Sequence, residues 1–212
     1  MLIECLLAAA ALVLLALFLL LPGHASFAQR QPFTGWCYAH RGLHSPDKSV
    51  PENSLAAFAA AADAGYGMEL DVQLSKDGEV VVFHDDTLDR VAGVHGRVDA
   101  FDWAQLREMP LCGTAHHMPL FSEVLATVAG RTPLIVELKS GPRNKELCQK
   151  TLALLRSYQG AFCVESFDPT IVAWFRRNAP DILRGQLSDS CAAFHKEGDS
   201  LIGSFALSLS LI

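Results

Sequence analysis

The sequence has no surplus of basic residues, no glycine-rich nucleotide turn and no paired cysteines. Lysine and arginine total 17 against 23 aspartates and glutamates, for a formal charge of −6, which gives no electrostatic argument for nucleic-acid binding. No GxGxxG motif occurs, and this argues against a doubly wound dinucleotide-binding sheet. The six cysteines are scattered without a CxxC pair or zinc-ligand spacing. We therefore expect unpaired, mostly buried thiols, which favour a reducing compartment.

One long hydrophobic run is present, at the N-terminus. Residues 1–22 are almost wholly apolar, with Glu4 as their only charge, and this length suffices to cross a bilayer as a helix. We expect a transmembrane helix or signal anchor over 1–22, followed by a linker over 23–34. A cleaved secretory signal is the alternative, because Ser26-Phe27-Ala28 resembles a small-residue cleavage site, although no lysine or arginine precedes the run.

The basic residues nearest to this run all follow it, at Arg30, Arg41 and Lys48. Positive charge is retained on the cytoplasmic side of a membrane helix. The sequence therefore predicts a single-pass membrane protein with its main domain in the cytoplasm. A cleaved signal would instead make the protein secreted or extracytoplasmic.

Segments typical of strands and helices alternate over residues 35–187. Strands are expected at 36–40, 68–73, 80–84, 134–139, 162–167 and 182–187, and helices at 53–64, 102–108, 121–129, 144–158 and 168–178. This alternation predicts an α/β fold with a parallel sheet. Polar side chains follow or end several strands, at His40, His84 and Glu137, which favours a β/α (TIM-type) barrel over residues 35–212, because barrel active sites are built at that face.

Two carboxylates lie on one face of the strand over 68–73. Successive strand side chains point to opposite faces, so Glu69 and Asp71 point the same way. Buried carboxylates are costly unless a cation or a proton neutralises them. With Glu137 they would form a three-carboxylate oxygen site of the kind that Mg²⁺ or Ca²⁺ binds. The alternatives are ion pairs of Glu69 and Asp71 with nearby basic residues, and a buried pair between Glu137 and Lys139.

Two histidines stand at the ends of two predicted strands, where they can flank a substrate held on the metal. One of His40 and His84 would deprotonate a nucleophile while the other protonates the leaving oxygen. Arg41 and Lys139 supply positive charge for an anionic substrate, and arginine suits phosphate. The combination fits hydrolysis of a phosphate ester. Taken singly, either histidine can be structural and Arg41 can serve a surface ion pair. His116-His117 resembles a metal motif, but we expect a solvated loop there.

Five short motifs occur in a fixed order between residues 36 and 188. They are Ala39-His40-Arg41-Gly42, Pro51-Glu52-Asn53-Ser54, Glu69-Leu70-Asp71-Val72, Phe83-His84-Asp85 and Val136-Glu137-Leu138-Lys139. In order and spacing the set resembles the glycerophosphodiester phosphodiesterase family. That resemblance implies a β/α barrel that hydrolyses glycerophosphodiesters to sn-glycerol 3-phosphate and an alcohol with a divalent cation. Matched by position, the implied roles are metal binding by Glu69, Asp71 and Glu137, acid/base catalysis by His40 and His84, and substrate binding by Arg41, Glu52 and Lys139.

The chain departs from this family pattern after Leu187. Family members continue through two more strands, the last with a Trp-Thr segment, and nothing after Leu187 resembles them. A barrel with six of eight strands keeps open edges, so we expect a barrel that is truncated at its C-terminus. Two alternatives therefore stand beside a glycerophosphodiesterase: lysophospholipase D-like hydrolysis of lysophospholipids at the membrane, and an inactive membrane-tethered binding protein or fragment.

Overall fold

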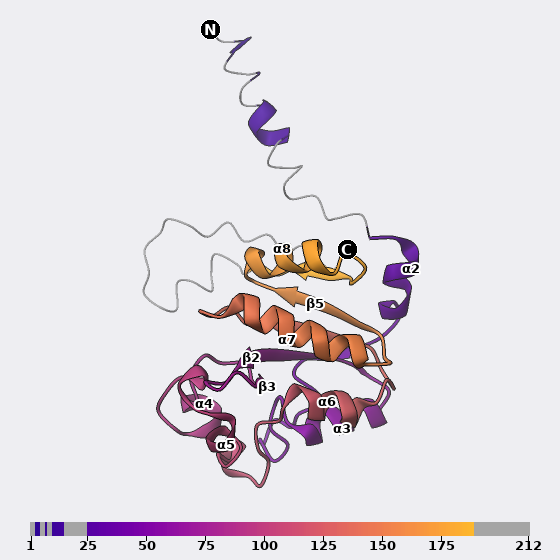
Figure 1. Cartoon of the computed structure of the whole chain (residues 1–212). Helices are drawn as coiled ribbons and strands as arrows, with labels where there is room; N and C mark the ends of the chain where they lie inside the picture. The colour runs from indigo at the N-terminus through magenta and orange to yellow at the C-terminus, as the bar shows by residue number, and fades with distance from the viewer. Residues whose placement is uncertain (1–2, 5–6, 8–9, 15–24, 189–212) are drawn as a thin grey trace.

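The computed structural model describes residues 3–4, 7, 10–14 and 25–188 (Figure 1). Most of the predicted membrane-spanning segment, residues 1–22, lies outside the described residues, as does the tail from residue 189 onward with His195. Within the described residues, no helix combines the length and the apolar character that crossing a bilayer requires.

A six-stranded sheet forms the centre of the fold. Its strands are β1 (Tyr38–Ala39), β2 (Gly67–Leu74), β3 (Val80–Val82), β4 (Leu134–Leu138), β5 (Phe162–Ser166) and β6 (Arg184–Gln186). β1, β2, β4, β5 and β6 are parallel and neighbour one another in that order. This is the predicted α/β arrangement with a mostly parallel sheet. Over the described residues, β1 and β6 are the edge strands of that order.

β3 is not one of the parallel strands, although the predicted barrel counted it as such. It pairs antiparallel with β2, with Val82 opposite Val72. A connection of a few residues can only join antiparallel strands, since a parallel pair needs a crossover of a dozen or more. The turn contains Gly78 at φ 87°, a backbone conformation that favours glycine. The hairpin brings the chain back beside Asp71, whose carbonyl accepts a 3.0 Å hydrogen bond from the amide of Phe83.

Four longer helices pack on the apolar side of the sheet (Figure 1). They are α3 (Leu55–Asp63), α6 (Phe121–Val128), α7 (Asn144–Ser157) and α8 (Pro169–Asn178). Ser54 caps α3, and Asp168 caps α8 ahead of a proline at its first position, which are favourable residues for a helix start. Phe58, Phe121 and Phe175 are fully buried between helices and sheet. Burying each of these side chains contributes roughly 1.5–3 kcal/mol.

The segment between β3 and α6 forms a compact insertion with its own core. It contains α4 (Asp89–Ala92), η2 (Val98–Ala100), α5 (Trp103–Leu106) and η3 (Leu111–Gly113). Leu88, Leu106 and Leu111 pack in this core against Phe83 and Val81 at the end of the hairpin. The insertion is therefore anchored to the same hairpin that carries His84.

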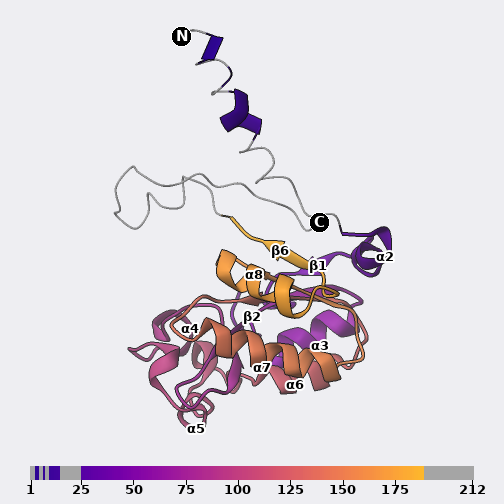
Figure 2. The same ribbon diagram turned by 45° about the horizontal axis from the view of Figure 1, so that its top comes forward.

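The predicted linker 23–34 contains two short helices, α2 (Phe27–Arg30) and η1 (Gln31–Phe33). α2 begins with a capping box formed by Ser26 and Gln29. Phe33 packs with Tyr38 on the inner side of the sheet, and the hydroxyl of Tyr38 donates to the Phe33 carbonyl at 3.1 Å. Figure 2 shows α2 beside β1, at the end where the parallel strands begin. The segment thus covers the end of the sheet opposite the polar strand ends.

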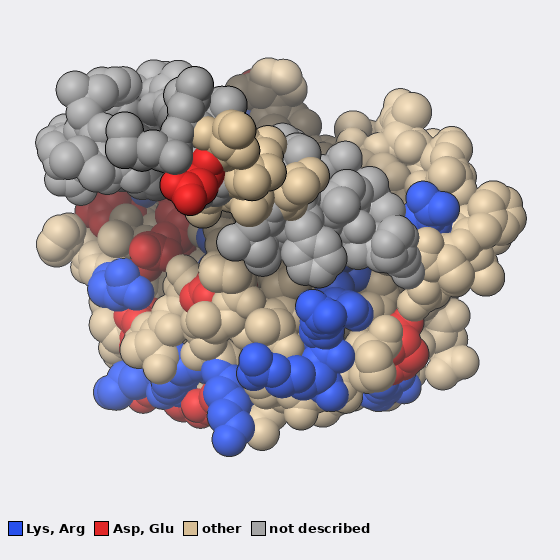
Figure 3. All heavy atoms as spheres, turned by 90° about the horizontal axis from the view of Figure 1, so that it is seen from above, with Lys and Arg blue, Asp and Glu red and all other residues tan. Residues whose placement is uncertain are grey.

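Charged side chains of both signs are mixed on the surface. On the described part of the face in Figure 3, basic side chains lie mainly along one margin, with acidic side chains near them. α7 carries an ion pair within the helix, between Lys150 and Glu146, and a second one to the loop before β6, between Arg156 and Asp181.

Candidate active site

Three carboxylates converge on the inner side of the sheet. Parallel pairing sets Asp71 on β2 opposite Glu137 on β4, and Glu69 lies two residues earlier on the same face of β2. One carboxylate oxygen from each of the three lies within 4.8 Å of the others, and all three residues are buried. The structure therefore brings together the three residues that the sequence analysis predicted as metal ligands.

The environment of these carboxylates fits a divalent cation. Burial, reinforced by the charge of Asp71, raises the pKa of Glu69 to about 8. Burial also raises the pKa of Glu137, against the opposing effect of Lys139. Oδ1 of Asp71 is buried and accepts no hydrogen bond, although Nζ of Lys139 lies 3.5 Å away. A cluster of buried carboxylates with an unsatisfied oxygen is suited to a hard cation such as Mg²⁺ or Ca²⁺.

Glu165 is a fourth carboxylate of this layer, which the sequence analysis missed. It lies on β5 directly opposite Glu137 in the parallel register, and only 9% of the residue is exposed. Burial first, then the charges of Glu137 and Asp71, raises the pKa of Glu165 to about 7. The sequence did contain a signal for Glu165. It is the last residue but one of its strand, as Glu137 is of β4, so the two side chains point to the same face of the sheet.

His40 immediately follows β1 and faces Glu69. Its Nε2 atom lies 3.7 Å from Oε2 of Glu69, although the side chain is 68% exposed. Partial loss of water around the ring lowers the pKa of His40, and the positive charge of Arg41 lowers it further, with His84 close enough to contribute. A neutral imidazole at this position can accept a proton near neutral pH.

His84 follows β3 and is oriented by its neighbour. Its Nδ1 lies 2.6 Å from Oδ1 of Asp85, and Nε2 has no hydrogen-bond partner among the described residues. A carboxylate on one ring nitrogen fixes the tautomer and leaves the other nitrogen available for chemistry. The structure therefore places His40 beside Glu69, with His84 close enough to influence the pKa of His40.

Arg41 and Glu52 form an ion pair at the entrance to the site. Nη1 of Arg41 donates to Oε1 of Glu52 at 2.8 Å, while the backbone amide of Arg41 donates to Oε2 of Glu69 at 3.0 Å. Hydrogen bonds from Arg90 first, and then those from Arg41, outweigh burial and lower the pKa of Glu52 to about 2. Glu52 is therefore ionised, and its carboxylate is held by two arginines.

Lys139 is paired within the site, as the alternative interpretation expected. Its Nζ atom donates to Oε1 of Glu137 at 2.9 Å. Burial lowers the pKa of Lys139, but the Glu137 carboxylate outweighs that effect and the pKa is raised. The side chain is therefore charged at neutral pH and adjoins the carboxylate layer, where an anionic group could reach it.

Three residues in the loop before α3, Arg41, Lys48 and Asn53, have left-handed backbones although they are not glycine. Arg41 has φ 57° and Asn53 has φ 55°, in a region that costs about 1–2 kcal/mol for most side chains. Between them, Gly42 at φ 80° lies so close to α3 that a Cβ atom there would be 2.9 Å from Ala57. Such strain is typical of functional sites whose surroundings hold the backbone in place.

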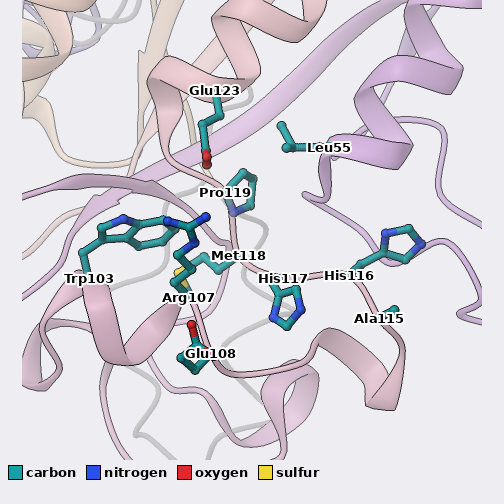
Figure 4. Close-up of a pocket in the computed structure, with 10 residues that line it drawn as sticks. All are labelled: Leu55, Trp103, Arg107, Glu108, Ala115, His116, His117, Met118, Pro119 and Glu123. Carbon is teal, nitrogen blue, oxygen red and sulfur yellow. The ribbon is translucent and has the colours of Figure 1, made fainter.

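His116 and His117 lie apart from the carboxylate layer. Figure 4 shows them with Trp103 and Arg107 around a separate open cavity of about 410 Å³. His117 is exposed, and neither side chain belongs to a metal-compatible group in the described part of the chain. Elsewhere on the surface, His95 is an exposed partner of Asp89.

A mostly parallel sheet with an acidic centre near the carboxyl ends of its strands defines the chain as a β/α-barrel protein with a candidate metal site. A model of the "Glycerophosphoryl diester phosphodiesterase family" matches residues 40–198, and the chain belongs to that family. The family resemblance drawn from the five sequence motifs is thereby confirmed.

Curated relatives agree with this assignment. The chain is 34% identical over 161 residues to a glycerophosphodiester phosphodiesterase from Bacillus altitudinis, covering 68% of this chain and 63% of the relative. It is 33% identical over 170 residues to a lysophospholipase D from Rattus norvegicus, covering 73% and 52%. The chain spans between 44% and 65% of the length of four bacterial relatives that it matches.

Solved structures show the same fold. A phosphodiesterase from Oleispira antarctica, in complex with the product sn-glycerol-3-phosphate, aligns with a TM-score of 0.67 at 25% identity, covering 77% of this chain and 70% of that one. A protein from Silicibacter pomeroyi described as a glycerophosphoryl diester phosphodiesterase aligns with a TM-score of 0.68 at 26% identity, covering 83% and 74%.

Proposed function

We propose that this protein hydrolyses glycerophosphodiesters to sn-glycerol 3-phosphate and an alcohol with the help of a divalent cation. The observation that carries the proposal is the layer of Glu69, Asp71 and Glu137 with His40 and His84 beside it. Family membership supports the reaction class, and the product complex of the Oleispira antarctica relative supports the substrate class.

In this proposal the three carboxylates hold Mg²⁺ or Ca²⁺, which neutralises charge on the phosphodiester and polarises it for attack. Arg41 and Lys139 bind the remaining phosphate oxygens. One of His40 and His84 removes the proton from the nucleophile, and the other gives a proton to the leaving alcohol oxygen. The Asp85 contact presents His84 through Nε2, and partial burial favours a neutral His40.

The test is release of glycerol 3-phosphate from glycerophosphocholine with added Mg²⁺ or Ca²⁺. We expect turnover that stops with a chelator, and a loss of roughly 100-fold or more for His40→Ala, as general acid/base groups contribute about 10²–10⁴-fold. Glu69→Ala should also lower turnover strongly, because it removes one of the proposed metal ligands. Unchanged turnover in either variant would remove the role assigned to that residue.

Lysophospholipase D-like hydrolysis is the second candidate, favoured by the relatives from Rattus norvegicus and Mus musculus that carry this name, both 33% identical. Comparing glycerophosphocholine with lysophosphatidylcholine at equal concentration separates the two activities. The third candidate is a membrane-tethered binding protein without activity. Such a protein would bind the metal in calorimetry and turn over neither substrate.

We further propose that residues 1–22 anchor the protein as a single-pass segment with the catalytic domain in the cytoplasm, because the run is apolar and the nearest basic residues follow it. Membrane flotation with protease protection tests both parts. A protein released by carbonate washing would argue against the anchor, and a domain shielded in sealed vesicles would support the secreted alternative.

A further inference from the structure

Arg90 on α4 bridges two carboxylates that come from different segments of the chain. Its Nη1 and Nη2 atoms donate to Oε2 and Oε1 of Glu52 at 2.9 and 2.7 Å. Its Nε and Nη2 atoms donate to Oδ2 and Oδ1 of Asp85 at 2.6 and 2.8 Å. Both contacts are two-point pairs, the geometry in which arginine binds carboxylates most strongly.

The donors of Arg90 are almost fully used by this bridge. A guanidinium has five N–H groups, and four of them serve the four hydrogen bonds to Glu52 and Asp85. One N–H of Nη1 remains. Arg90 therefore cannot bind a phosphate with a two-point contact while the bridge is intact. Its role must come from the residues that Glu52 and Asp85 hold in place.

Each bridged carboxylate also holds a residue of the proposed site. Glu52 accepts a 2.8 Å hydrogen bond from Nη1 of Arg41. Asp85 lies 2.6 Å from Nδ1 of His84. Arg90 thus joins the proposed phosphate-binding arginine to one of the proposed catalytic histidines. Among the described side chains, it alone bonds both carboxylates.

The electrostatics show that the bridge is held in its charged form. Burial raises the pKa of Asp85, but the hydrogen bonds from Arg90 and His84 outweigh it and the pKa falls to about 2. Hydrogen bonds from Glu52 and Asp85 raise the pKa of Arg90 in turn. Glu52 and Asp85 are 17% and 21% exposed at their side chains, so the pairs are better shielded than an ordinary surface ion pair.

We propose that Arg90 is a positioning residue that fixes Arg41 and His84 relative to each other. This inference rests on the proposed function. The insertion, through α4, then sets the separation between the phosphate-binding group and the proton-transfer group. A lysine cannot replace Arg90, because a single ammonium lacks the planar fork that grips two carboxylates at once.

Kinetics of the full chain with glycerophosphocholine provide the first test. We expect Arg90→Met to lower kcat/KM by about 10–100-fold, the usual effect of removing a group that orients the residues at a metal site. Arg90→Lys should recover only a small part of the lost kcat/KM. Arg156→Met is the matched control, because Arg156 is similarly exposed and makes a two-point pair with Asp181 remote from the site. It should stay within about twofold of wild type, as exposed pairs contribute little.

Proton NMR of the metal-free, substrate-free protein provides a second test that needs no activity. The short contact to Asp85 should give the His84 Nδ1 proton a downfield resonance that exchanges slowly with water. We expect this resonance to move or broaden in Arg90→Met and to persist in Arg156→Met. If Arg90→Met does not fold, Arg90→Lys carries both measurements.

Two outcomes would overturn the proposal. Activity of Arg90→Met within twofold of wild type would mean that the bridge is not needed. Lost activity with an unchanged His84 resonance would mean that Arg90 acts on the substrate directly. If the wild-type protein turns over no glycerophosphodiester, the proposed function fails, while the NMR comparison still decides whether Arg90 holds His84.

Discussion

The side-chain amide of Asn53 donates a 2.8 Å hydrogen bond to Oδ2 of Asp71, so the loop before α3 is tied directly to the carboxylate layer. Both residues are almost fully buried. The helix predicted over 53–64 includes Asn53, but α3 begins at Leu55 and is capped by Ser54. Asn53 is free to reach the site because its own backbone is left-handed, a conformation that asparagine tolerates better than most residues.

Replacing Asn53 separates the hydrogen bond from the backbone conformation. Asn53→Gly keeps the favourable backbone and leaves a buried acceptor unpaired, which costs about 1–3 kcal/mol. Asn53→Ala adds the left-handed strain of about 1–2 kcal/mol. We expect unfolding free energies in urea to fall in the order wild type, Gly, Ala. Equal stability of the two variants would contradict the backbone part of this argument.

Gly42→Ala should destabilise the protein more than a strained backbone alone. A Cβ atom there would meet Ala57 of α3 at 2.9 Å, displacing the Arg41 loop or the helix. Gly65→Ala is the matched control, because Gly65 has a similar φ of +74° with nothing within 4 Å of its Cβ position. We expect about 1–2 kcal/mol for the control, and a larger loss together with reduced turnover for Gly42→Ala. Similar losses of stability in both variants would mean that α3 can move away from the added Cβ atom at little cost.

Glu165→Gln should stabilise the metal-free protein in a pH-dependent way. The pKa of Glu165 is about 7 in the fold against an ordinary 4.5, so the native state holds its proton more tightly than the unfolded chain does. That preference makes wild-type stability fall as the pH rises from about 4.5 to 7. The gap in unfolding free energy should be small at pH 4 and reach on the order of 2–3 kcal/mol at pH 8. A gap independent of pH would contradict the assignment.

Cation binding should tighten with pH and release a proton. Glu69, with a pKa of about 8 in the absence of metal, must lose its proton to act as a ligand. Calorimetry with Mg²⁺ or Ca²⁺ in two buffers of different ionisation enthalpy should show proton release at pH 7 that declines toward pH 9. Glu69→Gln should bind more weakly and lose most of this dependence. Release that is unchanged in the variant would assign the proton to another group.

The parallel strands and the three-carboxylate layer were predictable because they depend on local patterns. Alternation along β2 alone requires Glu69 and Asp71 to share a face. The contribution of Glu165 depends on the register between β4 and β5, which a single strand does not reveal. β3 runs antiparallel to β2 because its connection is short. The prediction counted it as a parallel strand because it considered only the alternation of strands and helices.

Arg90 could not be predicted, because its role depends on contacts made across the fold. It lies 38 residues from Glu52 in sequence, and α4 has only four residues, too few for a recognisable helical pattern. α2 was missed for a related reason, since its four residues follow an apolar run and resemble a linker in sequence.

All eight residues of β2 are buried, but they face two different interiors. Met68, Leu70 and Val72 lie in the apolar core with α3 and α6, while Glu69 and Asp71 face the carboxylate layer. A one-residue slip against β4 would exchange these sets and place two carboxylates among phenylalanines. A shifted register is therefore destabilised by Glu69 and Asp71, the residues proposed to bind metal. The same carboxylates thus favour the correct pairing of β2 with β4 during folding.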